Sequence, residues 1–143
     1  MAATRTAHTV WNGDLFEGSG NTTLDSSGLG TYAVTWKARA EQSEGKTSPE
    51  ELIAAAHSSC FSMAFSLALS QAGFTVEEIN TKADVTFVPG TGITGSHLTV
   101  NATIPGISEE EFQKIAGEAK VGCPVSGALA SIDITMDATL AAS

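Results

Sequence analysis

Residues 46–63 read KTSPEELIAAAHSSCFSM, and this stretch predicts the beginning of the helix on which the fold depends. Ser48 is a favourable N-cap, Pro49 suits the first helical position because its missing N–H needs no partner there, and Glu51 completes a capping box. Residues 52–76 contain no Asp, Glu, Lys or Arg, and their apolar or small side chains fall on every side of a helix. We therefore expect a central helix, ending near its first glycine, that is buried all round.

The same helix is long enough to cross a membrane, since about 20 apolar residues suffice. It also carries five serines, His57 and Gln71, which are unusual in a membrane span without a function there. We interpret it as the core helix of a soluble protein and keep a membrane span as the alternative. The small side chains on either side of His57 leave room for a close partner element, from the same chain or from a second subunit.

Length, charge and the N-terminus bound the class of protein. The 143 residues fit one domain, 1–143, which is large enough to bury a core. Sixteen acidic against seven basic residues give a net charge of −9, which argues against nucleic acid or an anionic membrane surface as a partner. The N-terminus lacks the apolar segment of a signal peptide, so we expect the cytoplasm. Cytoplasmic cysteines are more often catalytic, redox-active or simply buried than paired in structural disulfides.

The residues before the helix predict an antiparallel sheet. Asn12-Gly13 is a favoured two-residue hairpin turn, because both turn positions need a positive φ. The residues that follow include a segment rich in β-branched and aromatic side chains, which favour strands. The expected strands are 8–11, 14–16, 21–25 and 31–36, followed by a polar connector over 37–46.

The residues after the helix predict two more helices and a second set of strands. Ser108 and Glu111 form another capping box, and Cys123 lies directly before Pro124, at the N-cap of a short helical turn. Alternating apolar residues indicate half-buried strands. The expected strands are 81–88, 93–104 and 132–140. The element order predicts an α+β domain, with antiparallel sheets wrapped around the buried central helix.

The two cysteines are the candidate reactive groups. Cys60 and Cys123 lie 63 positions apart and match no zinc-ligand spacing, so we expect no metal. A thiolate at Cys123 would be stabilised by the positive end of the helix that begins at Pro124. His57 precedes Cys60 by one helical turn and could act as its base, but the sequence shows no orienting acid or oxyanion motif. Two inert buried cysteines, and a satisfied core histidine, are the alternatives.

These motifs together resemble one known family. The stretch KTSPEELIAAAHSSCFSM, with CPVS at residues 123–126, is similar to the osmotically inducible protein C (OsmC) family. Its sister group is the organic hydroperoxide resistance (Ohr) proteins. The resemblance covers essentially the whole chain. It favours the OsmC branch, because residues 11–17 lack the early arginine of the Ohr branch.

The resemblance implies a thiol peroxidase of oxidative and osmotic stress. Cys60 would attack a hydroperoxide and become a sulfenic acid, which Cys123 would resolve into a disulfide. Arg39 and Glu50 match the charged pair that family members place beside the reactive sulfur. No cofactor is implied beyond an external thiol reductant, which could be a lipoyl group, another small dithiol or a thioredoxin-like protein.

The helix geometry adds a constraint on the quaternary structure. Glu50 and Cys60 are ten residues apart, or about 15 Å along one helix, so their side chains cannot touch. If Glu50 and Arg39 serve Cys60, they must come from another copy of the chain. We therefore expect an intertwined homodimer, which the resemblance also implies.

A substrate pocket is expected around Cys60. An apolar wall would favour organic hydroperoxides over hydrogen peroxide by about 0.8 kcal/mol per buried methylene. Two other functions stay open: a non-catalytic ligand-binding or stress protein with inert cysteines, and a cysteine hydrolase that uses Cys60 and His57. The expected pocket residues are Leu52, Ile53, His57, Phe61, Met63 and Phe65.

Overall fold

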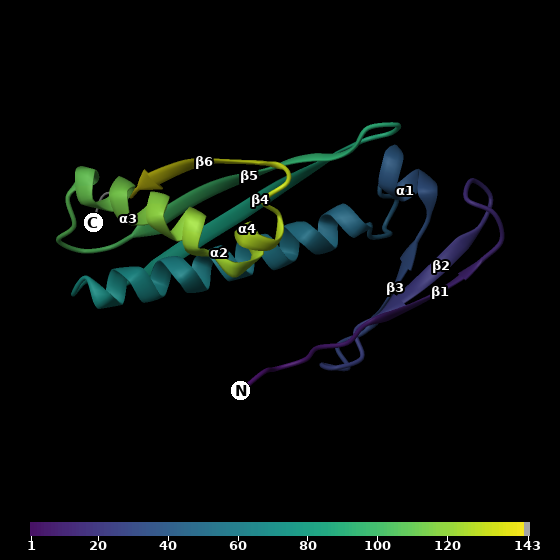
Figure 1. The fold of residues 1–143 in the computed structure, drawn as a ribbon, viewed down its shortest axis with the longest axis horizontal. Coiled ribbons are helices and arrows are strands. Elements are labelled where there is room, and N and C mark those ends of the chain that lie inside the picture. Colours follow the sequence, from purple (N-terminus) through teal and green to yellow (C-terminus); the bar gives the residue numbers. More distant parts are fainter. Residues whose placement is uncertain (142–143) are drawn as a thin grey trace. The chain divides into compact units, whose positions relative to one another are not determined.

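The computed structural model describes residues 1–141 and has the predicted α+β composition (Figure 1). Its contacts divide the chain into two compact units, the first comprising Met1–Leu52 and the second beginning at Ile53. Helix α2 (Pro49–Gln71) runs through this boundary. Its first turn therefore belongs to the first unit and its remaining turns belong to the second.

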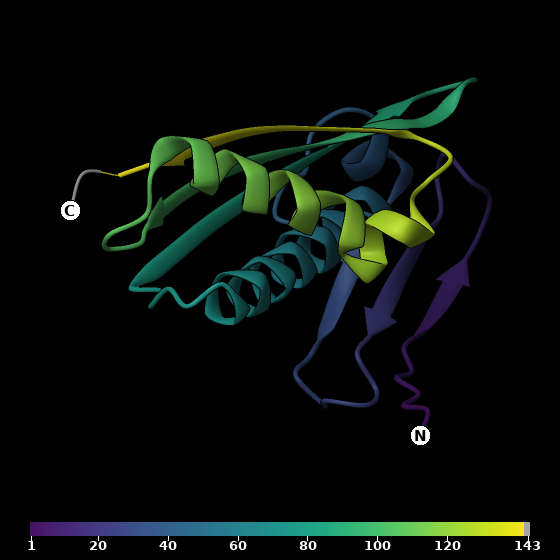
Figure 2. The same ribbon diagram turned by 60° about the vertical axis from the view of Figure 1, so that its left-hand side comes forward.

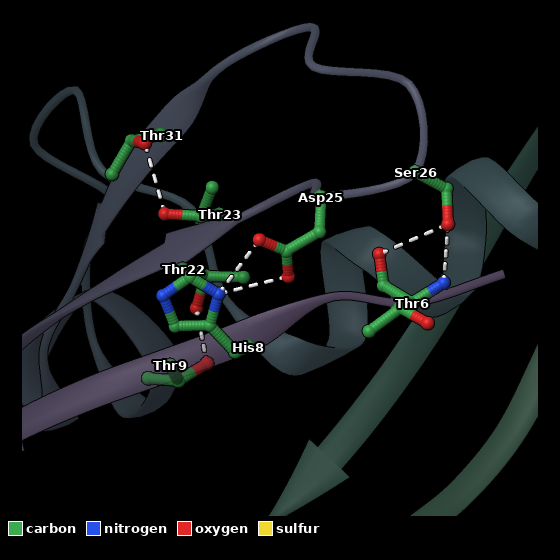
Figure 3. Close-up of polar contacts among 8 residues, drawn as sticks. All are labelled: Thr6, His8, Thr9, Thr22, Thr23, Asp25, Ser26 and Thr31. Atoms are coloured by element: carbon green, nitrogen blue, oxygen red, sulfur yellow. Dashed lines mark hydrogen bonds and ion pairs between the residues drawn. The ribbon is translucent and has the colours of Figure 1, made fainter.

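The first unit contains the antiparallel sheet that the sequence predicts, in the order β1-β2-β3. A hydroxyl pair joins Thr9 of β1 to Thr22 of β2 at 2.9 Å (Figure 3). A second pair joins Thr23 to Thr31 of β3, also at 2.9 Å. Such cross-strand pairs stabilise a sheet. The strands are β1 (His8–Asn12), β2 (Ser19–Thr23) and β3 (Thr31–Val34).

The predicted hairpin at Asn12-Gly13 is wrong in its second strand. Gly13 does have a positive φ of 95°, but β2 begins at Ser19 instead of residue 14. The Asp14 carboxylate accepts a hydrogen bond from the Glu17 N–H at 2.8 Å, and the Asp14 carbonyl accepts one from the Gly18 N–H at 3.0 Å. Asp14 thus closes a turn of its own and delays the second strand.

The expected polar connector after β3 contains a short helix that the sequence analysis missed. Helix α1 (Trp36–Ala40) begins after Thr35, whose hydroxyl accepts a hydrogen bond from the Ala38 N–H at 3.1 Å. A threonine at this position is a usual N-cap. The consequence is that Arg39 is held on a helical turn and not on an irregular loop.

Helix α2 begins where the sequence predicts. The Ser48 hydroxyl accepts a hydrogen bond from the Glu51 N–H at 3.1 Å, as expected of an N-cap. The Glu51 carboxylate accepts a second hydrogen bond at 2.6 Å from the Thr47 hydroxyl. At the other end, Gly73 adopts a φ of 91°, the left-handed conformation that commonly ends a helix.

The second unit contains a sheet in the order β4-β5-β6. Strands β4 (Glu78–Val88) and β5 (Gly92–Thr103) are antiparallel, whereas β6 (Asp133–Leu140) runs parallel to β5. The expectation of antiparallel sheets only is therefore wrong for β6. The chain between β5 and β6 returns through α3 (Glu109–Gly122) and α4 (Pro124–Ala128), and such a helical crossover allows parallel pairing.

The core of the second unit lies between this sheet and the helices α2 and α3, which share one face of it in both views (Figures 1 and 2). Phe61 and Phe65 of α2 have ring centroids 5.5 Å apart, and Phe65 lies 5.7 Å from Phe112 of α3. Leu98 and Val100 of β5 complete the centre and have no exposed surface. The predicted alternation of β5 is confirmed by these two residues.

The prediction that α2 is buried all round is wrong for the chain by itself. Phe61 and Phe65 are buried, but Met63 is 73% exposed and Leu67 is 59% exposed. The sheet and α3 cover only part of α2, so some of its apolar residues remain exposed. Among the described residues, α2 is the one helix long and apolar enough to cross a membrane. A core helix has the same properties, so this is weak support for a span.

Candidate active site

The two cysteines meet in the second unit. Cys60 lies in the middle of α2 and is half-buried, whereas Cys123 is the N-cap of α4 and is 1% exposed. Both thiols are free, and each shifts the pKa of the other, so they lie close together. The fold therefore brings together two sulfur atoms that are 63 positions apart in the sequence.

The surroundings of Cys123 favour its ionised form. Burial acts to raise the pKa of this thiol. Hydrogen bonds from Cys60, from the backbone N–H and hydroxyl of Ser126 and from the backbone N–H of Val125 outweigh burial, and the pKa of Cys123 lies below its ordinary value. These N–H groups belong to the first turn of α4, where they lack helical partners. The position before Pro124 has the thiolate-stabilising character that the sequence predicts.

The groups around Cys60 act in the opposite direction. Burial is the largest cause, and the hydrogen bond with Cys123 also raises the pKa of Cys60. A hydrogen bond from the Val125 backbone lowers it, but less. Within this unit the surroundings therefore raise the pKa of Cys60 and lower that of Cys123.

An open groove of about 510 Å³ runs beside Cys60. Its walls come from α2, α3 and the first residue of α4, and most of them are apolar. Met63, Ala64 and Leu67 follow Cys60 at the spacing of one helix face. The lining residues are Cys60, Met63, Ala64, Leu67, Ala68, Gln71, Glu118, Ala119, Gly122 and Pro124.

The structure changes the predicted pocket wall. Met63 lines the groove as expected. Phe61, Phe65 and His57 have no exposed surface and belong to the core. Leu52 lines a separate cavity within the first unit. The predicted wall consists of neighbours of Cys60 along the chain, whereas a helix places residues three, four, seven and eight positions later on the same face.

Arg39 and Glu50 form an ion pair in the first unit. The Arg39 Nε lies 3.1 Å from both carboxylate oxygens of Glu50, and Nη2 lies 2.9 Å from Oε2. Glu50 is 6% exposed, so the pair is largely shielded from water on the carboxylate side. Two parallel contacts of this kind fix the direction of a guanidinium group. The two residues that the resemblance singles out are thus partners of each other.

His57 does not face Cys60. Its Nδ1 lies 2.7 Å from the Ser96 hydroxyl and its Nε2 lies 2.9 Å from the Ser126 hydroxyl. The ring has no exposed surface, and burial lowers the pKa of His57, which keeps the imidazole neutral. Both nitrogens have serine partners, so His57 is the satisfied core histidine of the sequence analysis, and its use as a base for Cys60 finds no support in this geometry.

The sequence of this chain matches a known protein family. The family described as OsmC-like protein matches residues 41–137. The chain belongs to the OsmC family. It is 43% identical over 130 residues to peroxiredoxin OsmC of Escherichia coli, covering 89% of this chain and 90% of that protein. It is 31% identical over 111 residues to organic hydroperoxide resistance protein-like 2 of Staphylococcus epidermidis, covering 74% and 77%.

Solved structures of OsmC and Ohr proteins share the fold. An OsmC-like protein from Mycoplasma pneumoniae has a TM-score of 0.74 at 16% identity, covering 99% of this chain and all of that one. An organic hydroperoxide resistance protein from Elizabethkingia anophelis has a TM-score of 0.66 at 26% identity over the full length of both chains. The predicted OsmC-like fold is confirmed.

Two polar residues of this OsmC chain were missed by the sequence analysis. Ser126 follows the N-cap Cys123 by three positions, which is where a side chain can return to the N-cap residue. Ser96 precedes Leu98 and Val100 on the inward side of β5, so its inward position follows from the same alternation. A serine at a strand position that faces the core was the feature of the sequence that could have indicated Ser96.

Proposed function

We propose that this protein is a thiol-dependent peroxidase that reduces organic hydroperoxides to alcohols through a disulfide between Cys60 and Cys123. The observation that carries the proposal is that two free thiols interact beside an apolar groove, with Cys60 in the groove lining. The relatives named peroxiredoxin and organic hydroperoxide resistance protein support the same kind of enzyme.

In the first step the Cys60 thiolate attacks the distal oxygen of the hydroperoxide. A sulfur–oxygen bond forms and the oxygen–oxygen bond breaks, and the alkoxide takes up a proton to leave as the alcohol. Cys60 fits this role better than Cys123, because it lines the groove, whereas Cys123 is almost completely buried.

The Arg39–Glu50 pair of a second copy would supply what Cys60 lacks. The second unit raises the pKa of Cys60, so an added cation is needed to make its thiolate the reactive one. Glu50 lies ten residues before Cys60 on α2, about 15 Å along the helix axis, which prevents contact within one helix. A homodimer that brings Arg39 of one copy to Cys60 of the other resolves both points. The exposed apolar residues Met63 and Leu67 are consistent with a partner surface.

In the second step Cys123 attacks the sulfenic acid at Cys60. The sulfur–sulfur bond forms, the sulfur–oxygen bond breaks, and the hydroxyl leaves as water after taking up a proton. An external dithiol then reduces the disulfide by two thiol exchanges. A lipoyl group, another small dithiol and a thioredoxin-like protein are all chemically competent, and a reducing cytoplasm would sustain the cycle.

The groove would select the substrate. Its walls are formed mainly by side chains of Met, Leu and Ala, and Glu118 and Gln71 are the polar members. Alkyl and aryl hydroperoxides bury apolar surface there that hydrogen peroxide does not have. We therefore expect cumene hydroperoxide to react faster than hydrogen peroxide.

Thiol counting tests the proposal. One equivalent of cumene hydroperoxide should remove two free thiols per reduced chain, and mass spectrometry should show an intramolecular disulfide between Cys60 and Cys123. The matched control is Cys123→Ser, which should stop at a sulfenic acid on Cys60 that dimedone traps.

Two outcomes would contradict the peroxidase. Loss of no thiol would leave a ligand-binding or stress protein with inert cysteines. An acyl adduct on Cys60 after incubation with an activated ester, without disulfide formation from peroxide, would indicate a cysteine hydrolase. Sedimentation that finds a fully active monomer would remove the proposed dimer while leaving the peroxidase chemistry in place.

A further inference from the structure

The polar residues buried in the second unit form one chain of hydrogen bonds that ends at a cysteine. Among the described residues from Ile53 onward, the buried polar side chains are His57, Ser96 and Ser126. His57 bonds both serines. Ser126 lies in the first turn of α4, whose N-cap is Cys123, and its hydroxyl lowers the pKa of that thiol. The run is Ser96, His57, Ser126, Cys123. Buried polar groups are costly unless they are satisfied, so a connected run of three in an otherwise apolar core calls for a reason.

The number of protons in this run determines its direction. A serine hydroxyl has one proton, so Ser126 can donate to the Cys123 sulfur only if its oxygen accepts from His57. His57 must then carry its proton on Nε2, and its bare Nδ1 accepts the proton of Ser96. With Cys123 ionised, all three protons point toward the sulfur. With Cys123 protonated, the whole run can reverse.

We propose that His57 is a positioning residue for disulfide formation: its neutral Nε2–H tautomer holds the Ser126 hydroxyl as a donor to Cys123, which keeps that sulfur ready to attack the Cys60 sulfenic acid. The inference rests on the proposed function, because it assigns Cys123 the resolving role. His57 does not line the groove, and both of its ring nitrogens are bonded to serines, so it acts through Ser126.

The charges around the run leave His57 in the neutral state that this role needs. The partners that meet the ring, Ser96 from β5 and Ser126 from α4, do not titrate in the working range. The titratable groups beyond them are Cys123 and Cys60, and Glu118 of α3 lines the groove on the Cys60 side. Burial lowers the pKa of His57, so the ring supplies a donor without adding a positive charge.

Single-turnover kinetics with four variants test the inference. In His57→Phe and Ser126→Ala, disulfide formation should slow about tenfold or more, the loss expected for one hydrogen bond to a charged acceptor. The first step, sulfenic acid formation at Cys60, should stay within about twofold of the wild-type rate, since the groove is untouched. His57→Gln keeps an N–H for Ser126 and should resolve near the wild-type rate. Ser96→Ala should have a smaller effect than Ser126→Ala, because it is one bond further from the sulfur.

The pH profile separates positioning from a loss of structure. In His57→Phe the slow disulfide formation should recover as the pH rises above the pKa of Cys123, because the thiolate then forms without the donor. In a Cys60→Ser background, thiolate absorbance should report a higher pKa for Cys123 in His57→Phe than in the parent. This second measurement needs no turnover and stays informative if the double variant is only moderately stable.

The failure of this inference differs from the failure of the peroxidase. Wild-type protein that forms no disulfide after oxidation overturns the proposed function. Wild-type protein that forms it, with His57→Phe and Ser126→Ala resolving equally fast at every pH, overturns the role of His57 and leaves the peroxidase intact. Slow disulfide formation in His57→Gln also overturns it, as does slow disulfide formation in His57→Phe that persists at high pH. Either result would mean that the substitution acts by disturbing the packing and not by removing a hydrogen bond.

Discussion

Cys60 and Cys123 lie close together, yet the regions that hold them shift the pKa of the two thiols in opposite directions. Cys123 sits at the start of α4, where N–H groups and the Ser126 hydroxyl lower its pKa. Cys60 sits on α2 beside an apolar groove, and burial raises its pKa. The comparison teaches that the surroundings of Cys123 within its own unit favour the thiolate, whereas those of Cys60 oppose it; under the proposed function, Arg39 of a second copy would supply the missing positive charge.

The largest effect should come from exchanging either sulfur for oxygen. Cys60→Ser should reduce peroxide consumption to the uncatalysed rate, because the attacking atom is lost. Cys123→Ser should keep the first turnover and lose the disulfide. Stopped-flow kinetics with one equivalent of cumene hydroperoxide would measure both. If Cys123→Ser also lost the first turnover while Cys60→Ser kept it, the roles of the two regions would be reversed.

The proposed dependence of Cys60 on the charge of Arg39 can be tested by removing that charge. Arg39→Ala should slow sulfenic acid formation by about 100-fold, the usual loss when one donor to developing charge is removed. Disulfide formation should change little, since Cys123 has its own donors. Arg5→Ala, at an exposed residue near the N-terminus, is the matched control. Equal first-step rates for the two alanine variants would remove Arg39 from the mechanism.

The contribution of the apolar groove beside Cys60 can be measured separately. Leu67→Ala should reduce the preference for cumene hydroperoxide over hydrogen peroxide by about fivefold, corresponding to about 1 kcal/mol of lost apolar contact. The measurement is the ratio of kcat/KM for the two substrates. Val88→Ala changes an exposed apolar residue of β4 outside the groove lining and should leave the ratio unchanged. A ratio that falls equally in both variants would point to a general loss of stability.

The smallest effect should be a pH dependence of the free energy of unfolding that arises from His57. The pKa of His57 is lowered in the folded state, so the unfolded chain binds a proton more readily. The free energy of unfolding should fall as the pH drops below about 6.5, by at most about 1.4 kcal/mol per pH unit. Urea unfolding of the reduced protein at several pH values, compared with His57→Gln, isolates this contribution from that of the other histidines. Parallel pH curves for the two proteins would show that His57 does not contribute.

Local rules predicted most of the fold. Ser48 and Ser108 cap their helices as expected, because an N-cap depends on residues only three positions apart. The N-cap position of Cys123 in α4 was predicted for the same reason, because Pro124 follows it directly. The parallel pairing of β6 was missed, since strand direction depends on how a long crossover returns the chain. The late start of β2 was missed because the Asp14 turn competes with Asn12-Gly13.

The candidate site was predicted in its elements but not in its contacts. Family resemblance indicated Cys60, Cys123, Arg39 and Glu50, while the residues alone left the cysteines open between function and burial. To predict the groove lining, one must know which face of α2 is left uncovered. The apolar residues of α2 occur on all its faces, so its sequence does not indicate that face. The link from His57 through Ser126 to Cys123 joins three elements, so no local spacing could reveal it.

The separation of the two thiols along the chain also has a thermodynamic consequence. A bond between α2 and α4 would close a loop of 64 residues, from Cys60 to Cys123. Restricting an unfolded chain with a loop of that length is worth about 4 kcal/mol of entropy. Each catalytic cycle would thus tighten and then release a cross-link, and the melting temperature of a sample would report which redox state it is in.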